Sequence, residues 1–391
     1  MRRAAQFASL LPFYLLLVAV LLLPRWASAE SVPLTVPIPG PPSVGAKSYM
    51  LMDYTSGQII AARNEHERVE PASLTKLMSA YVVFNELKKG TLKLDETVRV
   101  STKAWRTGGS RMFIQPDVPV KVSDLIQGLI VVSGNDATVA LAERVAGTEE
   151  AFVDLMNAYA RQLGMRNTHF ANADGLPVAN HYSSAYDLAL LARAIIRDFP
   201  QYFHWYSQKS YSYNNITQPN RNLLLYWDPS VDGMKTGFTD NAKYCLVSTA
   251  KRGQMRLISV VLGTDSPKAR AQQSQSLLNY GFRFYESRKI YSARQPLSTL
   301  RVWKGDPKEV QVGPAQDVYA IIPSGRAKQV RASLQLNPKP VPPIKRGQAL
   351  GQITVRVGDK VVTRVPAVAL QPVEEAGLIG RTIDTIRMKL D

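Results

Sequence analysis

The sequence is poor in cysteine and histidine, and each shortage excludes a kind of site. Among 391 residues there is one cysteine, Cys245, so no intramolecular disulfide can form. Cys245 lies in an apolar, strand-like stretch, which is typical of a buried structural thiol rather than a nucleophile. The four histidines do not follow metal-ligand spacing, so each is interpreted as a surface or core residue.

Acidic residues are also scarce relative to basic ones. The chain has 31 Asp and Glu against 48 Lys and Arg, which gives a formal net charge of +17. Such a protein is attracted to anionic surfaces such as cell wall or anionic lipid, although a solvated basic surface without a partner has the same composition. Neither zinc-finger spacing nor an aromatic-basic RNA motif is present, and we expect no nucleic-acid partner.

Long apolar runs are absent beyond the N-terminus. There, Arg2 and Arg3 precede the apolar run from Phe13 to Leu23, and Ala27-Ser-Ala29 follows as a small-residue cleavage site. This order predicts a signal peptide over 1–29 and export of the mature chain. An uncleaved membrane anchor is the alternative, but the run is short for a membrane span and the cleavage site favours removal.

Four kinds of pattern divide the mature chain. A Pro- and Gly-rich lead-in is followed by mixed helical and strand patterns, and a stretch of short alternating runs separated by Pro and Gly predicts an all-β domain. Helical periodicity returns at the C-terminus. The predicted fold class is therefore α+β, divided into a lead-in over 30–46, a first domain over 47–286, an all-β domain over 287–373 and a C-terminal helix over 374–391.

The C-terminal helix has an amphipathic pattern. Ile379, Ile383, Ile386 and Leu390 share one face, and basic residues lie elsewhere. We expect it to lie on an anionic membrane surface, and thus a periplasmic protein peripherally attached to the outer face of the inner membrane. A helix packed on its own domain or on another helix would show the same pattern.

Three short motifs occur in the first domain in a fixed order. Ser73-Leu-Thr-Lys76 opens an apolar-periodic helix predicted to run to about Lys88. Ser133-Gly-Asn135 interrupts two apolar helices, the first of which we expect Ser123 to cap, and Lys235-Thr-Gly237 follows near a strand. Each motif is weak alone, because Ser248 to Lys251 also fits Ser-x-x-Lys. The ordered set is a strong signal.

The motifs supply the parts of an acyl-transfer centre. Ser73 is the candidate nucleophile, and Lys76, one helical turn away, is the candidate base. A base must be neutral, and burial together with the positive helix end disfavours the ammonium form. Ser133 is placed to relay a proton from Lys76 to the leaving nitrogen, and Asn135 to hold the substrate amide.

Substrate binding is assigned to the third motif. Lys235 and Thr236 suit a carboxylate, and Gly237 lets an edge strand approach the substrate backbone. The N–H groups of Ser73 and Phe238 are candidates for an oxyanion hole. Taken singly, the motifs also fit an N-cap, an ordinary turn and a solvated hairpin edge.

The motif set resembles that of penicillin-binding proteins and class A β-lactamases. The Ser-Gly-Asn variant, the signal peptide, the β-rich tail and the terminal helix resemble the D-alanyl-D-alanine carboxypeptidases, which are low-molecular-mass penicillin-binding proteins. Longer matching stretches are Gly109–Met112, Gly128–Ala137, Ser183–Leu188 and Val231–Thr239.

This resemblance implies a β-lactamase/transpeptidase-like catalytic domain with helices on both sides of an antiparallel sheet. It implies removal of the terminal D-alanine from peptidoglycan pentapeptide stems through a Ser73 acyl-enzyme, inhibition by β-lactam antibiotics, and no cofactor or metal. The family places a basic residue near the substrate carboxylate, which corresponds to Arg270. It often has His after Lys-Thr-Gly, where this chain has Phe238.

Three rival functions share parts of this pattern. A class A β-lactamase would need a Glu-x-x-Leu-Asn motif between Ser133 and Lys235, and Asn172-Ala-Asp-Gly-Leu176 stands there instead. A D,D-endopeptidase would carry the same motifs but generally lacks the tail domain and helix. A non-enzymatic wall-binding protein would not need the full set of catalytic side chains.

Overall fold

The computed structural model describes residues 38–337 and 339–390. The predicted signal peptide (1–29) and the first part of the lead-in lie outside these residues. The described remainder of the lead-in, residues 38–46, contains neither helix nor strand.

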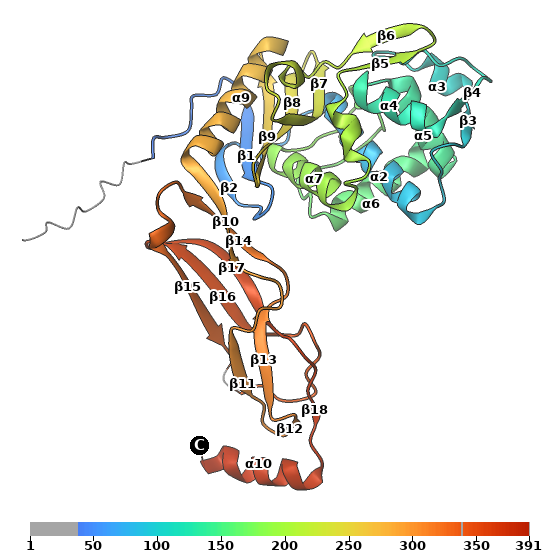
Figure 1. The fold of residues 1–391 in the computed structure, drawn as a ribbon. Coiled ribbons are helices and arrows are strands. Elements are labelled where there is room, and N and C mark those ends of the chain that lie inside the picture. Colours follow the sequence, from blue (N-terminus) through green and yellow to red (C-terminus); the bar gives the residue numbers. More distant parts are fainter. Residues whose placement is uncertain (1–37, 338, 391) are drawn as a thin grey trace, which may run out of the picture. The chain divides into compact units, whose positions relative to one another are not determined.

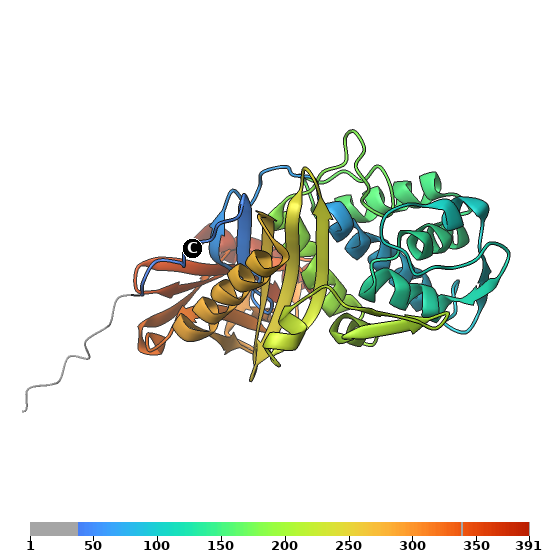
Figure 2. The ribbon, with the colours of Figure 1, turned by 90° about the horizontal axis from the view of Figure 1, so that it is seen from above.

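A five-stranded antiparallel sheet forms the centre of the catalytic half (Figures 1 and 2). Helix α9 covers one face of the sheet. The other face is covered by a group of helices that includes α2 and α7, called the helical part below. The strand order is β2-β1-β9-β8-β7, with bounds β1 Ser48–Asp53, β2 Ile59–Arg63, β7 Val231–Thr239, β8 Lys243–Arg252 and β9 Met255–Thr264.

Strand β1 shows why the sheet needs helices on both faces. All six of its residues are buried, with Met50 and Met52 in the core toward the helical part and Leu51 in the core under α9. Successive side chains point to opposite faces, so a continuous apolar strand is stable only when both faces are covered.

The helical part places two of the motifs. Its helices are α2 Lys76–Lys89, α3 Thr102–Arg106, α4 Val122–Val131, α5 Asn135–Ala146, α6 Glu149–Gln162 and α7 Ala185–Asp198. On the other face of the sheet, α8 Leu224–Trp227 shares the apolar core of α9 Pro267–Phe284. Short hairpins are β3 Thr97–Arg99 with β4 Pro119–Lys121, and β5 Ser210–Tyr213 with β6 Ile216–Pro219.

Two expected helix starts differ from the structure. The α-helix expected from Ser73 begins at Lys76, and Ser73 lies in a preceding 3₁₀ helix, Ala72–Thr75, where its side chain caps nothing. Ser123 lies within the first turn of α4, whose N-cap position is Lys121. At α4 the first backbone N–H groups, those of Val122 and Ser123, donate to the carbonyls of Glu96 and Leu94, so no side-chain cap is needed.

The C-terminal all-β part has its own apolar core, formed by residues such as Val310, Ile353 and Val355. Its main sheet has the order β11-β13-β17-β16-β15, and β10–β14 and β12–β18 form two small sheets. The bounds are β10 Tyr285–Tyr291, β11 Ser298–Arg301, β12 Gly305–Asp306, β13 Glu309–Pro314, β14 Val318–Pro323, β15 Val330–Leu336, β16 Ala349–Val357, β17 Lys360–Ala369 and β18 Glu374–Glu375.

The terminal helix α10, Leu378–Leu390, begins later than the predicted 374, because Glu374 and Glu375 pair with β12 instead. Within the described residues, no helix has the length and apolarity needed to cross a bilayer.

Candidate active site

Lys76 lies directly beneath Ser73. The Lys76 side chain is fully buried, and its Nζ is 3.2 Å from Ser73 Oγ. It also donates to Asn135 Oδ1 and to the backbone carbonyl of Asp174, both at 2.6 Å. All three donors of an ammonium are thus occupied by neutral oxygens, which fixes the nitrogen beside the hydroxyl.

Burial changes the acidity of Lys76. Loss of hydration disfavours the ammonium and lowers the pKa of Lys76 to about 8. The Asp174 carboxylate acts in the opposite direction, and the Arg221 guanidinium lowers the pKa further. A larger share of molecules therefore carries a neutral Lys76 at neutral pH than would carry a neutral free lysine.

Ser133 is hydrogen-bonded to Lys235. Ser133 adopts the left-handed region at φ 61°, in the tight connection between α4 and α5, and its Oγ accepts from Lys235 Nζ at 2.9 Å. Lys235 also donates to the Thr236 carbonyl at 3.0 Å. Burial lowers the pKa of Lys235 well below the usual value, and Lys76 adds to this effect. The expected relay partner, Lys76, makes no hydrogen bond to Ser133 among the described residues.

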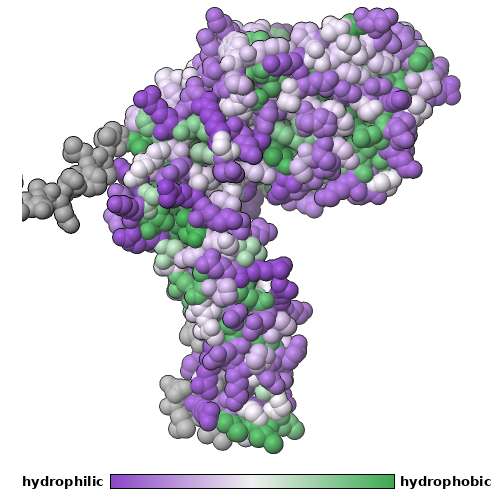
Figure 3. All heavy atoms as spheres, viewed as in Figure 1, coloured by the Kyte–Doolittle hydropathy of each residue, from purple (hydrophilic) through white to green (hydrophobic). Residues whose placement is uncertain are grey.

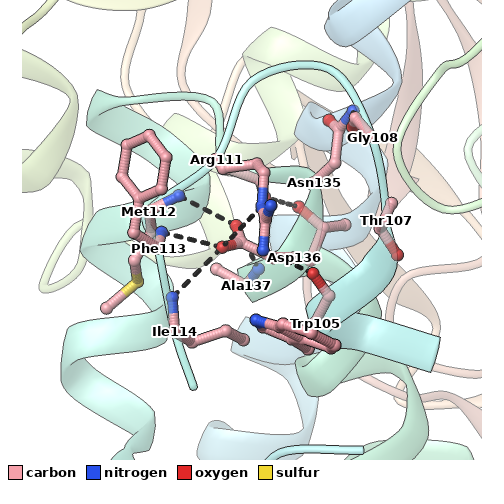
Figure 4. Close-up of polar contacts among 12 residues, drawn as sticks. Trp105, Thr107, Gly108, Arg111, Met112, Phe113, Ile114, Asn135, Asp136 and Ala137 are labelled. Atoms are coloured by element: carbon pink, nitrogen blue, oxygen red, sulfur yellow. Dashed lines mark hydrogen bonds and ion pairs between the residues drawn. The ribbon is translucent and has the colours of Figure 1, made fainter. Parts of the chain in front are cut away.

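Asp136, the residue after the second motif, holds the neighbouring loop (Figure 4). Its buried carboxylate accepts from the backbone N–H groups of Met112, Phe113 and Ile114 at 2.9, 2.8 and 3.3 Å. Arg111 lies 3.9 Å from the same carboxylate. A buried carboxylate is stable only with such partners, so Asp136 and this loop stabilise each other.

Asn135 fastens the other end of the same loop. Its Nδ2 donates to the Gly108 carbonyl at 2.7 Å, which leaves Oδ1 for Lys76. Gly109 follows at φ +78°, and a Cβ there would lie 2.7 Å from Asn135 Nδ2. Glycine is therefore required for the loop to approach the motif this closely.

The third motif lies on β7, an edge strand of the central sheet. Thr236, Gly237 and Phe238 follow Lys235 along the strand, and a Cβ on Gly237 would lie 3.0 Å from the Pro71 carbonyl. Glycine thus permits the strand to pass close to the turn that carries Ser73.

Arg270, from α9, contacts the same edge strand. Its guanidinium is buried and donates to the Gly237 carbonyl at 3.1 Å. Burial lowers the pKa of Arg270 to about 10. Since no described carboxylate pairs with it, a surface ion pair does not explain its position. Next to it, Phe238 is 46% exposed, and its ring centroid lies 4.4 Å from that of Tyr244.

These residues surround one cleft of about 680 Å³. Six predicted residues line it, whereas Lys76, Asn135 and Lys235 lie buried below its floor. The lining consists of Ser73, Ser110, Ser133, Pro219, Asn220, Arg221, Leu223, Tyr226, Thr236, Gly237, Phe238, Tyr244, Pro267 and Arg270.

Sequence reasoning missed two residues of this centre. Asp174 is buried and binds Lys76 through its carbonyl, and Arg221 Nη1 donates to Ser110 Oγ at 2.6 Å across the cleft. A tightly turned glycine next to Asp174 was the available signal. A Cβ on Gly175, at φ +85°, would lie 2.0 Å from the Ala72 carbonyl.

His181 is a satisfied core histidine, as expected. Its Nδ1 accepts from the Ala171 N–H at 3.0 Å, so its Nε2 carries the proton and donates to Thr75 Oγ1 at 2.7 Å. Burial lowers its pKa to about 4, which keeps the ring neutral. Cys245 is likewise buried and free.

Comparison with known proteins identifies the family. Residues 35–266 match the sequence model of the D-alanyl-D-alanine carboxypeptidases. The chain belongs to this family. Residues 285–375 match the model of the penicillin-binding protein 5 C-terminal domain, so the fold is a helix-and-sheet catalytic domain followed by an all-β domain.

Individual relatives agree over most of the chain. The D-alanyl-D-alanine carboxypeptidase DacA of Escherichia coli is 42% identical over 93% of this chain and 92% of its own length, and DacC of the same organism is 43% identical over 89% of each. The crystal structure of penicillin-binding protein 5 from Haemophilus influenzae matches with a TM-score of 0.83 at 41% identity, covering 86% of this chain and all of that one.

A more distant structure contains a bound antibiotic. Penicillin-binding protein D2 from Listeria monocytogenes, in its ampicillin-bound form, is 30% identical, with a TM-score of 0.58, over 62% of this chain and all of that one.

Proposed function

We propose that this protein is a serine-type D-Ala-D-Ala carboxypeptidase that removes the terminal D-alanine from peptidoglycan pentapeptide stems. The observation that carries the proposal is the pairing of Ser73 Oγ with a buried, weakly basic Lys76 at a cleft that Arg221 and Arg270 line and beside which Lys235 is buried. A hydroxyl beside an amine of lowered pKa is an activated nucleophile, and the cationic wall suits a free carboxylate.

In the proposed reaction, Ser73 Oγ attacks the carbonyl carbon of the penultimate D-alanine. Lys76 Nζ takes the hydroxyl proton as the Oγ–C bond forms, and Ser133 passes a proton to the leaving nitrogen as the C–N bond breaks. The N–H groups of Ser73 and Phe238 stabilise the oxyanion. Water then hydrolyses the ester, which releases the shortened stem and restores Ser73.

Substrate binding is assigned to the cations and the edge strand. Lys235, Thr236 and Arg270 bind the terminal carboxylate, Asn135 holds the stem amide, and Gly237 leaves room for the substrate backbone. Such a site suits the free C-terminus on which a carboxypeptidase acts.

β-Lactam antibiotics are proposed as covalent inhibitors of the same serine. Opening of the lactam ring by Ser73 keeps the leaving nitrogen tethered to the acyl group. Hydrolysis of the adduct is slow unless a further base drives it. Asp174 is the acidic residue next to Lys76. Its backbone carbonyl accepts a hydrogen bond from Lys76, and its carboxylate accepts one from the Leu176 N–H, so the carboxylate is already engaged. This arrangement supports a peptidase rather than a β-lactamase.

We further propose that the exported protein lies in the periplasm, attached peripherally to the inner membrane through α10. Leu378 and Ile379 are 76% and 80% exposed, and Ile383 is also exposed (Figure 3 shows apolar surface at this helix). Asp384 lies away from these side chains, where it accepts from the Lys304 N–H at 2.7 Å. Its charge therefore does not oppose insertion of the apolar face.

The domain boundaries also remain proposals. We assign 1–29 to the signal peptide, 30–46 to the lead-in, 47–286 to the serine peptidase domain, 287–373 to the all-β domain and 374–391 to the anchor segment, within which the helix begins at Leu378.

The activity is tested with a diacetylated Lys-D-Ala-D-Ala tripeptide. Incubation with the purified mature chain is expected to release free D-alanine, and prior treatment with benzylpenicillin is expected to block the release. Hydrolysis of benzylpenicillin at a rate comparable to that of the tripeptide, without D-alanine release, would instead identify a β-lactamase.

A further inference from the structure

The all-β domain contains a long stretch without any acidic residue. From Val318 to Gly358 there is neither Asp nor Glu. Seven basic residues lie in the same stretch, namely Arg326, Lys328, Arg331, Lys339, Lys345, Arg346 and Arg356. A solvated protein surface normally mixes both signs of charge, so a one-sign stretch of this length creates a local positive potential.

Strand register gathers part of this charge on one face of the main sheet. Arg331 on β15 lies opposite Arg356 on β16, and Thr354 of β16 lies opposite Arg364 of β17. Residues directly opposite each other share a face, so all three arginines point the same way. The opposite face carries Ile353 and Val355, which belong to the core of the domain.

We call this surface the β15–β17 face. It comprises Arg331, Ser333, Gln335, Gln352, Thr354, Arg356, Arg364 and Pro366. Besides the cations, it presents hydroxyls and amides but no aromatic side chain; the aliphatic Val361, which lies opposite Arg356, is half-buried. All of its members except the half-buried Thr354 are exposed.

The three arginines have no acidic partner among the described residues. Arg331 donates only to the backbone carbonyls of Lys328 and Val330, and Arg356 to that of Asp359. Ion pairs of the domain lie elsewhere, for example between Lys289 and Asp317. Like charges directly opposite each other on a sheet are destabilising, so the Arg331–Arg356 pair costs stability that a bound anion would return.

We propose that the β15–β17 face binds the anionic stem peptides of peptidoglycan and so holds the enzyme on its polymeric substrate. The proposal rests on the function proposed above. Every stem that such an enzyme acts on ends in a carboxylate. Because many stems are attached along one glycan chain, the polymer presents this negative charge repeatedly. Guanidinium groups pair with carboxylates, while Gln, Ser and Thr side chains hydrogen-bond sugar hydroxyls and amides. Because the face carries no exposed aromatic or large aliphatic side chain for insertion, it fits a wall polymer better than a lipid surface.

The test measures binding to purified, lipid-free sacculi by co-sedimentation. All proteins carry Ser73→Ala, so that binding is scored without turnover. Arg331→Gln, Arg356→Gln and Arg364→Gln are combined in one full-length variant. The matched control combines Lys93→Gln, Lys121→Gln and Lys251→Gln, which removes the same charge from exposed lysines of the catalytic domain.

We expect the arginine variant to bind sacculi roughly 10-fold more weakly than the control, given the modest contribution of each exposed ion pair. Sacculi whose carboxylates have been converted to amides should bind both proteins equally weakly. Since the substitutions remove a like-charge pair, the thermal unfolding midpoint of the variant should not fall. If it does fall, Arg364→Gln alone is compared with Lys93→Gln, and the arginine substitution should show a smaller loss of sacculus binding.

Equal binding of the arginine variant and the control would overturn the proposal. So would a loss confined to vesicles of phosphatidylglycerol and phosphatidylcholine with sacculus binding intact, because that result would make the face a lipid-binding surface. Release of D-alanine from the soluble tripeptide, measured in the same variants with Ser73 restored, tests the catalytic function separately and is expected to be unchanged.

Discussion

Basic residues occupy two contrasting environments in this protein. In the cleft, Lys76 is 0% and Lys235 3% exposed, and both donate to neutral oxygens. On the β15–β17 face, Arg331 and Arg356 are exposed and bind only backbone carbonyls. The comparison shows that the degree of hydration determines whether a basic side chain keeps its charge. Burial penalises the charge and turns a lysine into a base, whereas hydration preserves the charge for an external anion.

Loss of the nucleophile should have the largest effect. Ser73→Ala removes the oxygen that forms the acyl-enzyme, so both D-alanine release and covalent labelling by a fluorescent penicillin are expected to vanish. Labelling is read on a denaturing gel and the modified peptide is identified by mass spectrometry. A penicilloyl adduct on Ser133 or Ser248 would assign the nucleophile elsewhere.

Replacement of the buried base should come next. Lys76→Arg keeps a positive charge, but a guanidinium stays protonated and cannot accept the Ser73 proton. The acylation rate constant, measured by stopped-flow with a chromogenic β-lactam, should fall by at least ~100-fold, the usual scale for losing a general base. Near-normal acylation in this variant would exclude Lys76 from that role.

A smaller loss is expected from the carboxylate site. A bound carboxylate favours the ammonium form of Lys235, whose pKa burial lowers in the free enzyme. Lys235→Gln removes this amine, so kcat/KM for the tripeptide should fall by roughly 30-fold or more. Lys308→Gln, at an exposed position of the all-β domain, is the matched control and should have no effect. The parent enzyme should also process the C-terminally amidated tripeptide poorly. Equal turnover of acid and amide would remove the basis for this assignment.

The smallest effect on catalysis is expected from the anchor. Truncation after Glu375 deletes α10 and should release the protein into the soluble periplasmic fraction, with turnover of the tripeptide unchanged. Ile379→Ser with Ile383→Ser should act in the same direction, and Thr385→Ser serves as the control. Moderate salt should release little full-length protein, because apolar contact contributes more than the small charge of this helix. Failure of the full-length chain to co-sediment with anionic vesicles would contradict membrane attachment.

Local sequence order predicted the parts of the cleft but not all of their partners. Ser73 and Lys76 are three residues apart, so either a 3₁₀ or an α turn brings them together, and the wrong helix start did not matter. Gly237 is visible in the sequence as a missing side chain, but the close approach expected there was that of a substrate, whereas the structure shows the Pro71 carbonyl at this position. The Lys235–Ser133 bond joins residues 102 positions apart, and only tertiary packing decides which lysine reaches the hydroxyl.

The partners missed in the sequence are joined by long-range contacts. Asp174 reaches Lys76 with its backbone carbonyl, a group that every residue has, so no side-chain pattern announces it. Likewise, the basic face of the all-β domain depends on strand register, since Arg331 and Arg356 become neighbours only when β15 pairs with β16. By contrast, the alternating runs at 310–312, 330–334 and 353–357 were sufficient to predict the strands themselves.

The pH dependence of acylation tests the central claim most directly, namely that burial makes Lys76 a base. Only the neutral amine accepts the Ser73 proton, so the acylation rate constant should rise with pH and level off above a midpoint near the pKa of about 8. The carboxylate of Asp174 favours the ammonium form of Lys76, so Asp174→Asn should shift the midpoint to lower pH. The other ionisable groups near Lys76, namely Asp136, Arg221 and Lys235, are unchanged in this variant. A midpoint near the ~10.4 of a free lysine, or a profile that Asp174→Asn leaves in place, would contradict the account.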